Sequence, residues 1–97
     1  MKFTMQNDLE VIIKQLSSQG LQNQLDQTQE ECAELIVAIS KYRRKKLKDT
    51  KQDLIGEIAD VSIMIRQLCE LIGQKIIDEA IKEKLERSKI RLENGTI

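Results

Sequence analysis

The chain has 97 residues, with 16 basic and 16 acidic side chains and no His, so it is formally neutral at pH 7. This neutrality gives no general electrostatic case for binding DNA or another polyanion, and no apolar run approaches the roughly 20 residues of a membrane span. The absence of Pro, the four Gly and the 2 % of aromatic residues predict one all-α domain over residues 1–97. Two cysteines without a signal peptide favour reduced thiols and a cytoplasmic location.

The first helix is expected to start at Asn7 or Asp8, either of which can cap it, and to end at Gly20. Its apolar residues recur on one stripe, which predicts that one face packs against the rest of the domain. They are Leu9, Ile12, Ile13 and Leu16.

A second helix is expected from about residue 21 to 42. At about 100° per residue its apolar side chains fall in one arc. The arc contains Leu25, Cys32, Leu35, Ile36, Ala38, Ile39 and Tyr42. Glu31 falls inside this arc, Glu34 at its border and Glu30 just beyond it, so three carboxylates project toward one side of the helix.

A basic run from Arg43 to Lys51 follows, interpreted either as a solvated turn or as a loop that contacts phosphate. A third helix is expected from about residue 51 to 72, with Thr50 as its cap and Asp53 completing a capping box. Its apolar arc covers nearly half the circumference. The arc contains Leu54, Ile58, Val61, Met64, Ile65, Leu68, Cys69, Leu71 and Ile72.

Glu57 falls within the third helix's apolar arc, and Asp60 lies at its margin. Ala59 and Ile63 add a second apolar patch on the back of the same helix. A helix with apolar residues on two sides requires neighbours on both, so part of this surface is predicted to be a subunit interface.

Gly73 is expected to end the third helix, and a last helix should run from about Ile76 to the Asn94-Gly95 pair. Lys84 falls inside the apolar row of this helix, together with Ser88 and Arg91. Such a lysine either reaches out to solvent or finds an anionic partner.

A hairpin that turns near residues 43–50 brings the carboxylates of the second and third helices nearly abreast. Ionised carboxylates that share a poorly solvated site need a cation, because desolvation and mutual repulsion both oppose their charge. Oxygen ligands in this number suit Mg²⁺, with Mn²⁺ as a substitute. The alternative interpretation is a solvated flank with ion pairs on the helix surface.

The pattern Glu30-Glu31-x-x-Glu34, then 22 residues, then Glu57-x-x-Asp60 resembles the MazG-like all-α nucleoside triphosphate pyrophosphohydrolases. The similarity covers roughly residues 25–92. It implies a four-helix bundle with a central acidic helical hairpin, completed by oligomerisation as a homodimer or homotetramer.

The implied activity is Mg²⁺-dependent hydrolysis of a nucleoside triphosphate to the monophosphate and diphosphate. The resemblance makes Glu31, Glu34, Glu57 and Asp60 the metal ligands. Glu30 would hold a further metal ion or orient the attacking water.

The closing segment from Lys84 to Arg91 also resembles the C-terminal segment of that family. By this resemblance Lys84, Arg87 and Arg91 would face the phosphates. Several relatives have Asn where this chain has Ser88, which keeps a hydroxyl but lacks the paired donor and acceptor of an amide.

Three other functions are weighed against this one. A non-enzymatic helical interaction module, or a degenerate family member, would use the acids only for solubility and pairing. A di-iron carboxylate bundle normally uses a Glu-x-x-His motif, which a chain without His cannot supply. Nucleic-acid binding through residues 43–48 lacks interleaved aromatic residues.

Overall fold

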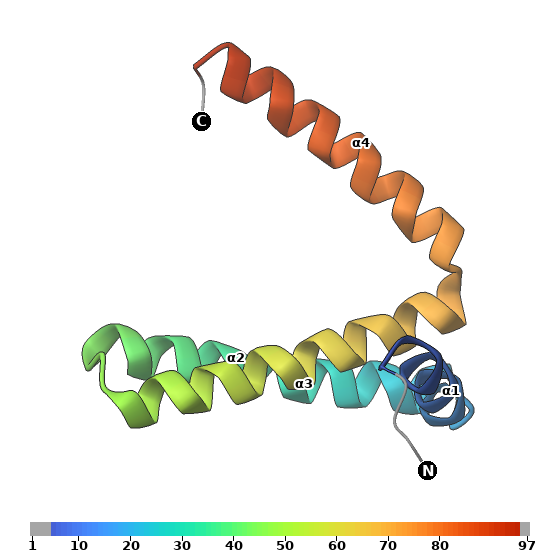
Figure 1. The fold of residues 1–97 in the computed structure, drawn as a ribbon, viewed down its shortest axis with the longest axis horizontal. Helices are drawn as coiled ribbons and strands as arrows, with labels where there is room; N and C mark the ends of the chain where they lie inside the picture. Colours follow the sequence, from blue (N-terminus) through green and yellow to red (C-terminus); the bar gives the residue numbers. More distant parts are fainter. Residues whose placement is uncertain (1–4, 96–97) are drawn as a thin grey trace.

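The computed structural model describes residues 5–95, which form four α-helices joined by short connections, with no strand among them. The all-α, four-helix expectation is therefore confirmed for this part of the chain. The helices are α1 (Met5–Ser17), α2 (Leu21–Arg44), α3 (Lys48–Ile72) and α4 (Gln74–Glu93). Helices α2 and α3 form an antiparallel hairpin, α1 crosses the end of it, and α4 extends away from it (Figure 1). Within residues 5–95, no helix combines the length and apolar character needed to cross a membrane.

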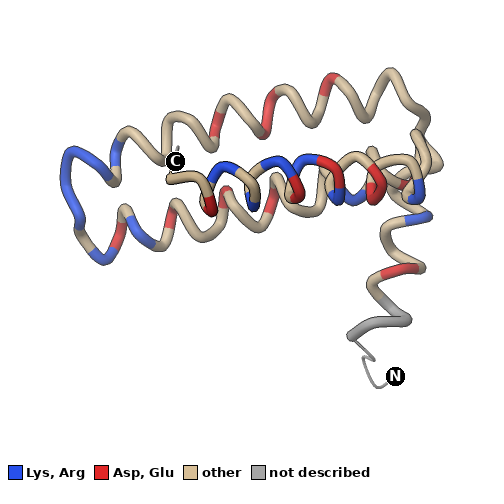
Figure 2. The backbone as a smooth tube through the Cα atoms, turned by 90° about the horizontal axis from the view of Figure 1, so that it is seen from above, with Lys and Arg blue, Asp and Glu red and all other residues tan. Residues whose placement is uncertain are grey.

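The turn of the hairpin is shorter than the sequence predicts. Helix α2 continues through Arg44, and α3 begins at Lys48 rather than at Lys51. Thr50 therefore lies inside the first turn of α3 and is not its N-cap. Its hydroxyl oxygen accepts a hydrogen bond from the Leu47 N–H at 3.0 Å and lies 2.7 Å from the Lys45 carbonyl oxygen, to which it can donate. These contacts hold a three-residue connection and bring the basic run to the tip of the hairpin (Figure 2).

Two other helix starts also differ from the prediction. Helix α1 begins at Met5, ahead of Asn7 and Asp8, because Met and Gln are good helix formers and extend it backwards. Helix α4 begins at Gln74 rather than Ile76, so only Gly73 separates it from α3. Gly73 has a φ of 132°, a conformation that side chains rarely adopt, which explains a glycine at this sharp bend.

Helix α1 is fixed to the hairpin at its C-terminal end. Ile13 is buried there, and the buried Ser17 hydroxyl lies 2.7 Å from the Ile13 carbonyl oxygen and 3.4 Å from the Gln67 carbonyl oxygen of α3. The hydroxyl therefore bridges two helices that are distant in sequence.

The contact between α2 and α3 near α1 includes polar groups. Gln24 is buried, and its Nε2 lies 3.4 Å from Thr28 Oγ1 and 3.3 Å from Met64 Sδ. Thr28 Oγ1 also donates to the Gln24 carbonyl oxygen at 2.7 Å. The two contacts between Gln24 and Thr28 lie within α2 and provide these buried polar groups with partners, whereas the contact to Met64 joins α2 to α3.

The predicted apolar arcs are only partly covered. Ala38 and Cys69 are buried, whereas Ile36 and Ile58 remain 65 % and 49 % exposed. Helix α4 diverges from the hairpin after its first turns and leaves much of both surfaces open (Figure 1).

Candidate metal centre

Three carboxylates from the two arms of the hairpin converge. Glu31 of α2 and Glu57 and Asp60 of α3 each offer an oxygen atom, and these atoms all lie within 4.8 Å of one another. Glu57 and Asp60 are three residues apart and therefore lie on the same side of α3. The antiparallel packing of α2 places Glu31 opposite them, as the sequence predicts.

Two of the carboxylate oxygens are isolated from both solvent and protein partners. Glu31 Oε2 and Glu57 Oε2 are each buried and have no hydrogen-bond partner. The two residues as a whole are only half-buried, so each side chain has one oxygen turned into the contact between the helices. A buried carboxylate oxygen without a donor is unfavourable, which makes these two atoms suitable ligands for a cation.

The local electrostatics point the same way. Burial raises the pKa of Glu31, and the neighbouring charges of Glu34, Asp60 and Glu57 raise it further. Burial likewise raises the pKa of Glu57, with further increases from Glu34, Asp60 and Asp53. Each shift means that the ionised form is disfavoured when no cation is present.

These raised pKa values predict how metal-free stability depends on pH. Above the ordinary carboxyl range the folded state holds protons that the unfolded state has released, so the free energy of unfolding falls as pH rises through the raised pKa values. We expect urea midpoints measured in EDTA to decrease over this range, and to decrease less in Glu31→Gln. Equal slopes for the two proteins would contradict the assignment.

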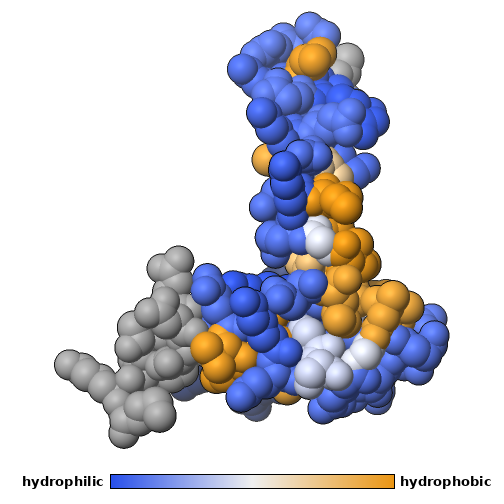
Figure 3. Space-filling model, turned by 90° about the vertical axis from the view of Figure 1, so that its right-hand side faces the viewer, coloured by the Kyte–Doolittle hydropathy of each residue, from blue (hydrophilic) through white to orange (hydrophobic). Residues whose placement is uncertain are grey.

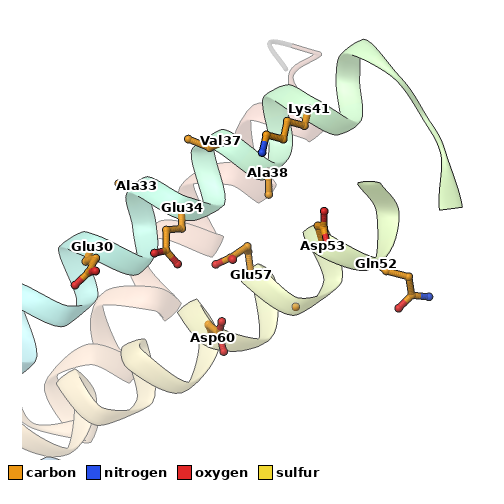
Figure 4. Close-up of a pocket in the computed structure, with 11 residues that line it drawn as sticks. Glu30, Ala33, Glu34, Val37, Ala38, Lys41, Gln52, Asp53, Glu57 and Asp60 are labelled. Carbon is orange, nitrogen blue, oxygen red and sulfur yellow. The ribbon is translucent and has the colours of Figure 1, made fainter. Parts of the chain in front are cut away.

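A hollow of about 600 Å³, within the size range of small-molecule sites, is lined by two of the three converging carboxylates, Glu57 and Asp60, and not by Glu31. Glu30 and Glu34 line it from α2 and Glu57 and Asp60 from α3, and Figure 4 shows the Glu34 and Glu57 side chains directed toward one another. Small residues leave the space open, and a Cβ on Gly56 would meet nothing within 4 Å. The other lining residues are Ala33, Val37, Ala38, Lys41, Gln52, Asp53 and Gly56.

The hollow contains charged residues that the sequence analysis did not assign to the site. The sequence predicts that Asp53 completes a capping box with Thr50, but α3 begins at Lys48, so Asp53 has no such role; it lies four residues before Glu57 and lines the same hollow. Lys41 also lines the hollow; it follows Glu34 by seven residues and therefore shares its side of α2. Helical spacing from the known acids would have identified both.

The residues predicted to bind substrate lie together, but elsewhere. Lys84, Arg87, Ser88 and Arg91 line a hollow of about 250 Å³ on α4. None of them lines the acidic hollow, whose described residues all belong to α2 and α3. Within one chain, the acids and the predicted phosphate-binding residues are therefore not brought together.

The donor set favours a hard cation. All three converging ligands are carboxylates, and neither cysteine is among them. Mg²⁺ and Mn²⁺ prefer oxygen ligands, whereas zinc sites are dominated by Cys and His.

Searches against protein-family models, curated proteins and solved structures found no match to this chain.

Proposed function

We propose that this protein is a divalent-metal-dependent nucleoside triphosphate pyrophosphohydrolase of the MazG-like type. One observation carries the proposal. Carboxylate oxygens of Glu31, Glu57 and Asp60 lie within 4.8 Å of one another, and Glu31 and Glu57 each have a buried oxygen with no hydrogen-bond partner. The hollow beside them is large enough for the phosphates of a nucleotide. The order and spacing of the acidic motifs add support from the sequence.

The carboxylates fit Mg²⁺, and Glu31, Glu57 and Asp60 are the residues that would hold it, with Glu34 beside them. When bound, the ion supplies positive charge against the phosphate oxygens. Glu34 is exposed and lines the hollow, and its negative charge raises the pKa of both Glu31 and Glu57. Its charge therefore acts at the position where the ion would bind.

Glu30 is the residue proposed to orient the attacking water. It is exposed, lines the hollow from α2 and lies on the same side as Glu34, four residues away. A carboxylate at this position can accept a proton from water as the water attacks the α-phosphorus, with diphosphate as the leaving group. This route requires no nucleophilic side chain, and Cys69, which is buried, takes no part in it.

The direct test is release of diphosphate from a panel of ribo- and deoxyribonucleoside triphosphates. We expect at least one of them to yield monophosphate and diphosphate in equal amounts, in a reaction that Mg²⁺ or Mn²⁺ supports and EDTA stops. Folded protein that is inactive on the whole panel with both ions would contradict the proposal. Release of single phosphates would indicate a different bond cleavage.

A further inference from the structure

The tip of the hairpin is strongly basic, although the chain as a whole is neutral. Of the nine residues of the basic run, six are basic, and Asp49 is the one acid. The six are Arg43, Arg44, Lys45, Lys46, Lys48 and Lys51, and all of them are exposed. The other 88 residues contain ten basic and fifteen acidic side chains. The run is seen at the hairpin tip in Figure 2, whereas hydrophobic side chains gather along α4 and at the end of the hairpin that adjoins it (Figure 3).

The acids of the hairpin leave most of this charge unopposed. Within residues 5–95, no ion pair joins a cation of the run to a carboxylate. Asp49 and Asp53 lie near the run but are outnumbered. Glu57 lies nine residues after Lys48, roughly 13 Å along α3, which exceeds the Debye length of about 8 Å at physiological salt. None of the nine residues lines the acidic hollow, so the run is available to a partner outside the chain.

Helix stability accounts for only part of the run. Arg43 and Arg44 lie in the last turn of α2, where cations interact favourably with the negative end of the helix dipole. Lys48 and Lys51 lie in the first turn of α3, where the positive end of the dipole disfavours them. Residues that oppose a local preference without a compensating contact are expected at functional sites, so these lysines indicate a role outside the helix.

Leu47, between Lys46 and Lys48, opposes two further preferences. It is the N-cap of α3, a position that favours Ser, Asn or Asp because their side chains accept a hydrogen bond from the helix, which a leucine cannot do. Its side chain is also 56 % exposed. An exposed apolar side chain among cations combines the two attractions of a peripheral membrane anchor, which are insertion at the boundary between headgroups and acyl chains and attraction to anionic lipids.

We propose that the basic run docks this protein on an anionic lipid surface, with Leu47 inserted among the headgroups and the cations against their phosphates. The run surrounds a three-residue connection at one end of the hairpin, and α1 lies at the other end, so this end can approach a flat surface (Figure 1). Nucleic acid is a less suitable polyanion, because the run has no aromatic side chain on which bases could stack. The docking does not depend on the proposed hydrolysis.

Sedimentation with lipid vesicles tests the docking. We expect the wild type to bind vesicles of equal parts phosphatidylcholine and phosphatidylserine at about 0.15 M salt, and to be released at about 1 M, where the Debye length falls to about 3 Å. Vesicles of phosphatidylcholine alone should bind far less. Each basic residue near an anionic surface strengthens binding about fivefold, so Lys48→Glu combined with Lys51→Glu should weaken it at least about 30-fold.

The same variant distinguishes a lost anchor from a lost fold. Glutamates in the first turn of α3 suit the helix dipole, so the variant should unfold at the same temperature as the wild type or a higher one. Lys82→Glu combined with Lys89→Glu is the matched control, because it makes the same change of charge at exposed positions of α4, outside both hollows. The control should bind vesicles nearly as well as the wild type. Equal weakening in the two variants would reflect net charge alone and would overturn the proposal.

Leu47→Asn tests the apolar part of the anchor. Because Asn is a favoured N-cap, the variant should be at least as stable as the wild type. It should nevertheless bind the phosphatidylserine vesicles about tenfold more weakly, since the leucine side chain is no longer inserted. Undiminished binding by this variant, or a wild type that does not bind these vesicles, would overturn the proposal. Binding to single-stranded RNA or duplex DNA without binding to vesicles would also overturn it and would make the run a nucleic-acid interface.

Discussion

Replacing Glu57 by Gln is expected to abolish diphosphate release while leaving the helical fold in place. Mutation of a residue that only hydrogen-bonds to a metal ligand and orients it typically lowers activity 10–100-fold. Loss of a direct metal ligand should therefore lower activity by at least about 100-fold. The fold should survive because Glu57 is half-buried, has one unpartnered oxygen and is repelled by Glu34 and Asp60. Steady-state kinetics and far-UV circular dichroism of the same preparation measure both effects.

Glu70→Gln is the matched control, because it makes the same change at an exposed position of the same helix, outside the acidic hollow. Its activity should remain close to that of the wild type. A large loss of helicity in Glu57→Gln would instead indicate that this carboxylate has a structural role. Full activity in Glu57→Gln would remove it from the metal centre.

Addition of Mg²⁺ is expected to raise the thermal stability of the wild type well beyond the effect of monovalent salt at equal ionic strength. A ligand that binds only the folded state stabilises it by about 2.7 kcal/mol at 100 times its dissociation constant. The increase should be large because the ion also removes the repulsion among Glu31, Glu57 and Asp60. Thermal unfolding followed by circular dichroism, with EDTA as the reference state, measures it.

Glu31→Gln separates this effect from general screening. Without metal, the variant should unfold at the same or a higher temperature than the wild type, since one of the repelling charges is gone. With Mg²⁺, it should gain much less. If Mg²⁺ acts no more strongly than the salt control on the wild type, the acids serve solubility and pairing, and a non-enzymatic helical module is the better description.

The convergence of the acids could be predicted because it depends on local periodicity. Glu31 and Glu57 each fall inside the apolar arc of their helix at 100° per residue. A short turn between the two helices makes these arcs face each other. The structure places their oxygens together. Asp53 lies on the same side, but its position near a helix start made a capping role the simpler interpretation.

The position of α4 could not be predicted in the same way. The apolar row containing Ile77 and Ile81 predicts that this face is covered, but periodicity does not indicate whether the cover comes from the same chain or another. The direction of α4 is set by the single residue Gly73, whose φ of 132° glycine alone tolerates readily. Helix periodicity does not specify this bend, and within one chain the bend leaves Lys84 outside the acidic hollow.

The helix starts illustrate a smaller limit of the same kind. Thr50 has the residue type of an N-cap, but its hydroxyl bonds back to Leu47 and Lys45, so the helix begins two residues before it. Cap preferences describe which residue types suit a helix start, and two candidate positions a few residues apart differ by only about 1 kcal/mol. Contacts in the turn decide between them.

The most direct measurement is anomalous diffraction from crystals soaked in Mn²⁺, which identifies the ion by element and position. We expect a single strong anomalous peak within coordination distance of carboxylate oxygens of Glu31, Glu57 and Asp60, and no peak at that position in Glu57→Gln. Crystals at saturating Mn²⁺ that show no peak there, with the three carboxylates directed apart into solvent, would contradict the proposed metal centre.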